Sequence, residues 1–88
     1  MKEWVADFQG HSIRVTNTWL GGAKLYIDGN CRDTNNDMFA VSSTKVRLTA
    51  RIDSSNPTSA LVEVFFKAIL AVNAKICVEG KQIGGDFT

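Results

Sequence analysis

The stretch Ala23-Lys24-Leu25-Tyr26-Ile27-Asp28-Gly29 occurs a second time as Ala74-Lys75-Ile76-Cys77-Val78-Glu79-Gly80. Every position is identical or conservatively replaced, except that Tyr26 corresponds to Cys77. Each copy ends in an acid followed by glycine, and glycine readily adopts the positive φ that a tight hairpin turn requires. Each copy therefore predicts a strand that enters a tight turn, followed by a short returning strand.

The similarity between the two halves of the chain continues upstream of this repeat. Residues 13–17 correspond to residues 62–66, and both segments alternate apolar and other side chains at their start. Before them lie residues 3–8 and 45–52. In the later segment one face would carry Val46, Leu48, Ala50 and Ile52, and the other Lys45, Arg47, Thr49 and Arg51, which is the pattern of a half-buried strand.

This organisation predicts an all-β fold for the chain. Its 88 residues suit one domain, 1–88, with pseudo-repeat halves at about 1–37 and 45–85. Two four-stranded units with one apolar face each would bury those faces against each other. We therefore expect a small antiparallel β-sandwich of two pseudo-repeated sheets, with Trp4 in the core. Residues 30–43 are interpreted as the connection between the halves, and residues 54–59 as a turn.

Residues 57–73 also fit a second structure. Pro57 would be the first residue of a helix capped by Asn56, and Glu63 and Lys67 would pair one turn apart. The alternative fold is then α+β, an antiparallel sheet with one apolar helix. The valines and phenylalanines of this segment form helices poorly, and the repeat favours strand.

The paired acid-glycine turns resemble the β-domain of Fas apoptotic inhibitory molecule. There too a strand of the Ile13/Val15 kind leads to a turn like Tyr26-Ile27-Asp28-Gly29, and a turn like Glu79-Gly80-Lys81 ends the domain. The resemblance covers most of the chain and departs from it at residues 68–72. It implies a protein-binding or protective role without catalysis, and it carries over no functional residue. In its size and lack of motifs the chain also looks like the orphan proteins of bacterial integron gene cassettes.

Composition and charge exclude several classes of partner. The formal net charge is +1, with acids and bases interspersed, so no basic cluster is present to neutralise a row of phosphates and we expect no nucleic-acid partner. No apolar run approaches the roughly 20 residues of a membrane span, and we expect no membrane partner. The N-terminal residues lack the pattern of a signal peptide. Together with Cys31 and Cys77, which we interpret as reduced thiols, this predicts a cytoplasmic protein.

Candidate catalytic and metal-binding residues are few. His11 is the single histidine, and neither cysteine has metal-ligand spacing, so we expect no cofactor and no metal. The loop Asp33-Thr34-Asn35-Asn36-Asp37 begins like a calcium loop, but Met38 and Thr44 stand where glycine and glutamate are required. An enzyme using His11 with Cys31 or Cys77 is a third hypothesis for function, behind two kinds of binding.

The aromatic and aliphatic residues of the second half predict a binding surface. Too many apolar residues follow one another there for an element with one buried face, and such a surface usually meets a partner. We expect a non-enzymatic protein-interaction module that binds a protein partner or forms a homo-oligomer, most simply a homodimer, through residues 65–72. A small apolar ligand between the sheets is the alternative. The candidate binding residues are Trp19, Phe65, Phe66, Ile69 and Leu70.

Overall fold

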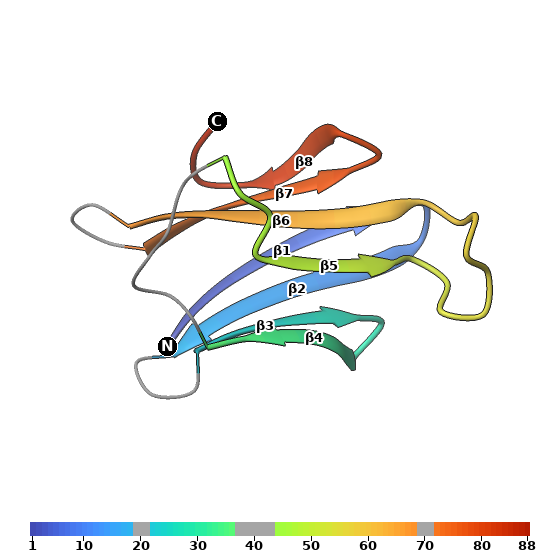
Figure 1. Ribbon diagram of the computed structural model, residues 1–88, viewed down its shortest axis with the longest axis horizontal. Coiled ribbons are helices and arrows are strands. Elements are labelled where there is room, and N and C mark those ends of the chain that lie inside the picture. The colour runs from blue at the N-terminus through green and yellow to red at the C-terminus, as the bar shows by residue number, and fades with distance from the viewer. Residues whose placement is uncertain (19–21, 37–43, 69–71) are drawn as a thin grey trace.

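The computed structural model describes residues 1–18, 22–36, 44–68 and 72–88, and these residues form eight β-strands and no helix. Sheet A contains four antiparallel strands in chain order, and sheet B contains the other four, also in chain order (Figure 1). The all-β prediction is confirmed. The strands are β1 (Lys2–Phe8), β2 (His11–Thr18), β3 (Gly22–Ile27), β4 (Asn30–Asn35), β5 (Leu48–Arg51), β6 (Leu61–Ala68), β7 (Val72–Val78) and β8 (Lys81–Gly85).

The sequence repeat is also a structural repeat, because each copy is the third strand of its sheet. The turn Asp28-Gly29 has φ values of 52° and 83°, and the turn Glu79-Gly80 has 52° and 79°. Two successive positive φ angles define the tight hairpin turn that matches the twist of the flanking strands. The β-bulge between Leu25 and Tyr26 recurs between Ile76 and Cys77. The two halves therefore share their backbone geometry as well as their sequence.

The acid of each repeat has a structural role. The carboxylate of Asp28 accepts a hydrogen bond of 2.9 Å from the amide of Ser12, and the amide of Asp28 donates to the Ser12 carbonyl. Glu79 makes the same two contacts with Leu61, again with a carboxylate distance of 2.9 Å. Each acid thus ties its turn to the first residues of the second strand in its sheet, which explains why both halves carry an acid here.

The core lies between the two sheets and is built from the inward residues of all central strands. Phe66 is fully buried, and its ring meets that of Trp4 edge-on at a centroid distance of 5.9 Å, which confirms Trp4 as a core residue. Such aromatic pairs add stability beyond the area that they bury. The other fully buried large residues are Ile13, Val15, Leu25, Leu48, Val62, Val64 and Ile76.

Each edge of sheet A lies beside an edge of sheet B, β1 next to β8 and β4 next to β5. Gly84 makes the first approach possible, because a Cβ there would come within 2.9 Å of the Ala6 Cβ. Where β4 lies next to β5, the Asp33 carboxylate accepts a hydrogen bond of 2.9 Å from the Thr49 amide. Side chains and close packing therefore protect strand edges that would otherwise be free to pair with other chains.

Three expectations need correction. Residues 61–68 are a strand and β7 begins at Val72, so the helix at 57–73 is wrong, and residues 69–71 lie outside the described part. Residues 30–35 form β4, which confirms the returning strand after Gly29 but removes these residues from the connection between the halves, so the start of the calcium-like pattern is a strand. Arg47 was expected on the solvent face, but it precedes β5 and is buried, and Asn35 of the neighbouring β4 donates a hydrogen bond to its carbonyl.

Candidate binding surface

The outer face of sheet B is the candidate binding surface. Strand alternation points the odd-numbered residues of β6 and β7 away from the core, where they form three cross-strand pairs. These pairs are Glu63 with Cys77, Phe65 with Lys75, and Lys67 with Asn73. All six side chains are half-buried or exposed except Cys77, which is buried. The face therefore combines an aromatic ring with two lysines.

A cluster of two phenylalanine rings and a lysine lies on this face. The Lys75 Nζ is 4.8 Å from the ring centroid of Phe65 and 5.5 Å from that of Phe87, a residue beyond the end of β8. The Lys67 Nζ lies 6.0 Å from the Phe87 ring. These are cation–π distances, and Lys75 links the two rings. We call Phe65, Lys75 and Phe87 the aromatic cluster.

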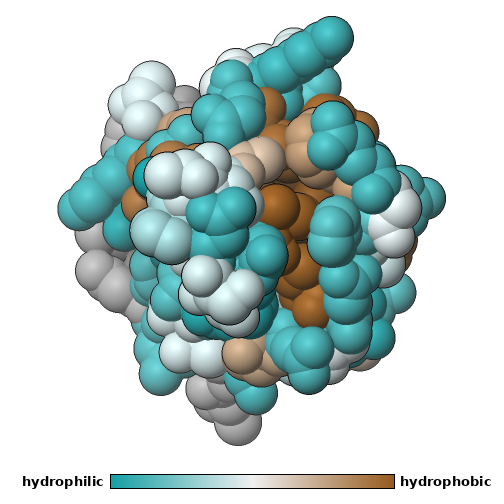
Figure 2. Space-filling view, turned by 90° about the vertical axis from the view of Figure 1, so that its right-hand side faces the viewer, coloured by the Kyte–Doolittle hydropathy of each residue, from teal (hydrophilic) through white to brown (hydrophobic). Residues whose placement is uncertain are grey.

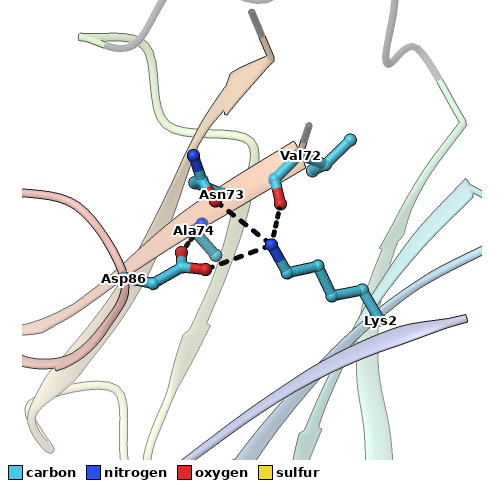
Figure 3. Close-up of polar contacts among 5 residues, drawn as sticks. All are labelled: Lys2, Val72, Asn73, Ala74 and Asp86. Carbon is cyan, nitrogen blue, oxygen red and sulfur yellow. Dashed lines mark hydrogen bonds and ion pairs between the residues drawn. The ribbon is translucent and has the colours of Figure 1, made fainter. Parts of the chain in front are cut away.

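Asp86 holds the main chain beside the aromatic cluster in place (Figure 3). Its amide donates to the Ala74 carbonyl at 2.8 Å, and its carboxylate accepts from the Ala74 amide at 2.8 Å. The other carboxylate oxygen is 3.2 Å from the Nζ of Lys2, which reaches across from β1 and also donates to the Val72 carbonyl and the Asn73 side chain. Asp86 thereby joins both sheets at this end of the molecule.

The electrostatics at Asp86 favour the charged carboxylate. Partial burial is the largest single influence and acts to raise its pKa, but the Ala74 amide, the Trp4 and Lys2 donors and the charge of Lys2 together outweigh burial, so the pKa lies below its ordinary value. The ion pair itself contributes little, because the Lys2 and Asp86 side chains are 43% and 38% exposed. The backbone contacts with Ala74 are the main anchor.

The equivalent positions in sheet A lack the aromatic cluster. Phe65 pairs with Lys75 in sheet B, and the corresponding pair in sheet A is Thr16 with Lys24. The lysine is common to both halves, whereas Phe65 stands in sheet B where sheet A has Thr16. The outer face of sheet A carries a different cation–π pair, Arg14 with Tyr26, at 4.7 Å. Because the two halves share one backbone plan, this difference concerns the surface and not the fold.

The structure separates the five predicted binding residues. Phe65 lies on the outer face of sheet B and is half-buried, whereas Phe66 is fully buried in the core and is not part of that surface. The reason is strand alternation, which points neighbouring residues to opposite faces. Trp19, Ile69 and Leu70 lie outside the described residues.

Two residues of the cluster were missed. Lys75 could have been found, because the repeat predicts antiparallel hairpins in which it faces a residue of the preceding strand. No pattern in the sequence indicates that Phe87 lies beside Lys75. Among the described residues, the large apolar side chains that are mostly exposed are Met1 at 83% and Val5 at 58%, on or next to β1.

The groups considered for catalysis are spread over both sheets. His11 lies at the start of β2, where its Nδ1 is 2.7 Å from the carboxylate of Asp28. That hydrogen bond, followed by the one from the Ser12 amide, lowers the pKa of Asp28. Both thiols are free, with Cys31 exposed on β4 and Cys77 buried on β7. Burial raises the pKa of the Cys77 thiol, with Lys75 opposing and Glu63 reinforcing this rise, which is the reverse of what an activated nucleophile requires.

In the described part of the chain, no group of three or more histidine, cysteine or acidic side chains is placed to hold a metal ion. The same residues include no helix long and apolar enough to cross a membrane. Comparisons with protein-family models, curated proteins and solved structures found no match to this chain.

Proposed function

We propose that this protein is a non-enzymatic interaction module that self-associates through the outer face of sheet B. The observation that carries the proposal is the aromatic cluster, in which Phe65 takes the place that Thr16 has in the other sheet. Phenylalanine at a half-exposed strand position contributes nothing to the core and gains burial when a partner covers it.

A second copy is the partner that the surface fits most simply. Two identical sheets can stack about a two-fold axis, so that each Phe65 meets the equivalent surface of the other copy. Glu63 and the two lysines of the same face provide both signs of charge. The rim of a face-to-face contact can then be self-complementary, as a symmetric interface requires.

The test compares Phe65→Thr with the wild type by sedimentation from low micromolar to millimolar concentration. Fully burying a phenylalanine contributes about 1.5–3 kcal/mol, and Phe65 is already half-buried, so each copy loses about 1 kcal/mol. Two copies lose about 2 kcal/mol, and dimerisation should weaken roughly 30-fold.

The matched control is Val5→Thr, which changes an apolar residue that is 58% exposed on the outer face of sheet A. It should leave the dimerisation constant unchanged. A wild type that stays monomeric at millimolar concentration, or a Phe65→Thr variant that dimerises like the wild type, would contradict the proposal.

Binding of a small apolar ligand between the sheets is a second candidate. The strand ends that carry the tight turns lie at the right-hand end of Figure 1, and Figure 2 shows an apolar strip there between polar residues. Phe8 at the end of β1 and Ala60 before β6 are partly buried apolar residues packed against the core. Ligands found by a thermal-shift screen should lose their effect in Phe8→Ser, and an unchanged shift would reject this site.

Two wider proposals accompany this function. We infer a cytoplasmic location from the exposed free thiol of Cys31, because exposed thiols persist in reducing compartments. A relationship to the β-domain of Fas apoptotic inhibitory molecule, or to integron cassette proteins, is also a proposal. Two small sheets with paired acid-glycine turns are what the first resemblance requires.

A further inference from the structure

The two turns that carry the repeated acids differ in one neighbouring side chain. Asp28 and Glu79 each accept a hydrogen bond from an amide at the start of the second strand in their sheet. His11 and Ala60 are the residues immediately before those two amides. The Nδ1 of His11 lies 2.7 Å from the Asp28 carboxylate, whereas Ala60 has no polar side chain to offer Glu79. Because Glu79 holds its turn without a histidine, the turn itself does not require His11.

His11 lies at the end of the sandwich that carries the tight turns, which we call the mouth, where the apolar strip is exposed (Figure 2). It pairs with Phe8 across the first hairpin, and strand alternation gives it the same inward side as the buried Ile13 and Val15. Phe8 and Ala60 are packed against the core at this end. The His11 side chain is 39% exposed. A polar ring therefore stands beside apolar side chains, between the core and the solvent.

The contact with Asp28 determines where the ring carries its proton. Hydrogen bonds from the His11 side chain and from the Ser12 amide lower the pKa of Asp28, so its carboxylate is charged at neutral pH. A charged carboxylate accepts hydrogen bonds and donates none, so Nδ1 must be the donor, and a neutral imidazole then offers Nε2 as an acceptor. Within the described part of the chain, no hydrogen bond reaches Nε2. The mouth thus combines apolar side chains with one oriented polar group, as small-molecule sites do.

We propose that the mouth binds an uncharged apolar molecule that carries a hydroxyl group, and that this hydroxyl donates a hydrogen bond to Nε2 of His11. This inference rests on the second candidate function, the binding of a small apolar ligand between the sheets. The apolar part of the ligand packs on Phe8 and Ala60. An ether or a carboxylate is disfavoured, because its lone pairs would face the lone pair of Nε2. A carboxylate would also be repelled by the charge of Asp28.

The test uses ligands with one apolar body and different polar groups, namely para-butylphenol, para-butylanisole and para-butylbenzoate. NMR titrations at about pH 8, where histidine is ordinarily neutral, follow binding through the amide resonances of Phe8 and Ala60. His11→Leu keeps a side chain of similar size but removes the acceptor. The affinity for the phenol should therefore fall roughly 2- to 10-fold, whereas the affinity for the anisole, which has no donor, should stay unchanged. The benzoate should bind most weakly.

Asp28→Asn tests the positioning of the ring proton. The side-chain oxygen of asparagine can keep the contact with the Ser12 amide, and its nitrogen then donates to Nδ1 of His11, which moves the ring proton to Nε2. The ring now donates at the mouth, so the affinity for the anisole should rise relative to that for the phenol. A purely structural role of Asp28 would leave this ratio unchanged.

The outcomes separate the inference from the candidate function on which it rests. If the phenol and the anisole bind at the mouth and His11→Leu affects both equally or neither, the hydroxyl assignment is wrong and the apolar site stands. A benzoate that binds most tightly, and loses this advantage in His11→Leu, means that the ring donates to an anion, which also overturns the inference. If none of these ligands moves the resonances of Phe8 and Ala60, the site and the inference are both rejected.

Discussion

Phe65 and Phe66 are neighbours in β6, yet their replacement by alanine should affect stability very differently. Phe66 is 0% exposed and packs on Trp4, whereas Phe65 lies half-buried on the outer face. Removing a fully buried phenylalanine leaves a cavity and costs about 3–5 kcal/mol. Removing a half-buried one costs about 1 kcal/mol, because roughly half of the transfer free energy is lost and no cavity forms.

Thermal unfolding followed by circular dichroism at low micromolar concentration measures both changes. For a domain of this size each kcal/mol shifts the midpoint by about 4–8 °C, so Phe66→Ala should lower it by at least about 12 °C and Phe65→Ala by about 4–8 °C. The low concentration keeps self-association out of the comparison. Equal shifts, or a larger one for Phe65→Ala, would refute the argument, because a slip of one residue in β6 exchanges the two faces.

Three further predictions concern charge, backbone and thiols. The pKa of Asp28 in the folded protein lies below its ordinary value of 3.8, so the charged carboxylate stabilises the fold above that pH, and this stabilisation is lost as pH falls through the folded-state pKa. Asp28→Asn should therefore be less stable than the wild type at neutral pH, and the difference should vanish at acid pH in denaturation series. Gly85→Ala should destabilise more than Gly10→Ala in urea unfolding, because both have positive φ but a Cβ at Gly85 would overlap the Ala74 carbonyl oxygen, whereas nothing lies within 4 Å at Gly10. A thiol reagent should label Cys31 in the folded protein but should label Cys77 only once the protein is unfolded, as mass spectrometry of the labelled protein would show.

The repeat was enough to predict the two sheets, because it combines a local turn signal with strand alternation. Asp28-Gly29 and Glu79-Gly80 impose the same backbone geometry wherever they occur, and Val62 and Val64 disfavour a helix. The prediction failed where contacts between the sheets decide. Arg47 is buried at the place where β4 contacts β5, and alternation within one strand carries no information about that neighbour.

The candidate site was less accessible from sequence. Strand alternation alone places Phe65 and Phe66 on opposite faces, so the sequence was sufficient to leave Phe66 out of the predicted binding surface. The position of Phe87 depends on the φ of 107° at Gly85 and on the anchoring of Asp86, which are properties of the folded chain. A residue beyond the last strand has no periodicity from which its contacts could be inferred.

If the domain self-associates as proposed, the difference between Thr16 and Phe65 sets how many copies can bind one another. In the proposed dimer only the face with Phe65 meets the partner, because the opposite face carries Thr16 at the matching position, so growth ends once two copies have met. Phenylalanine at residue 16 would give the domain a second adhesive face, and each added copy would then offer a new end. The asymmetry of an otherwise repeated architecture therefore marks the boundary between a closed pair and an open-ended polymer.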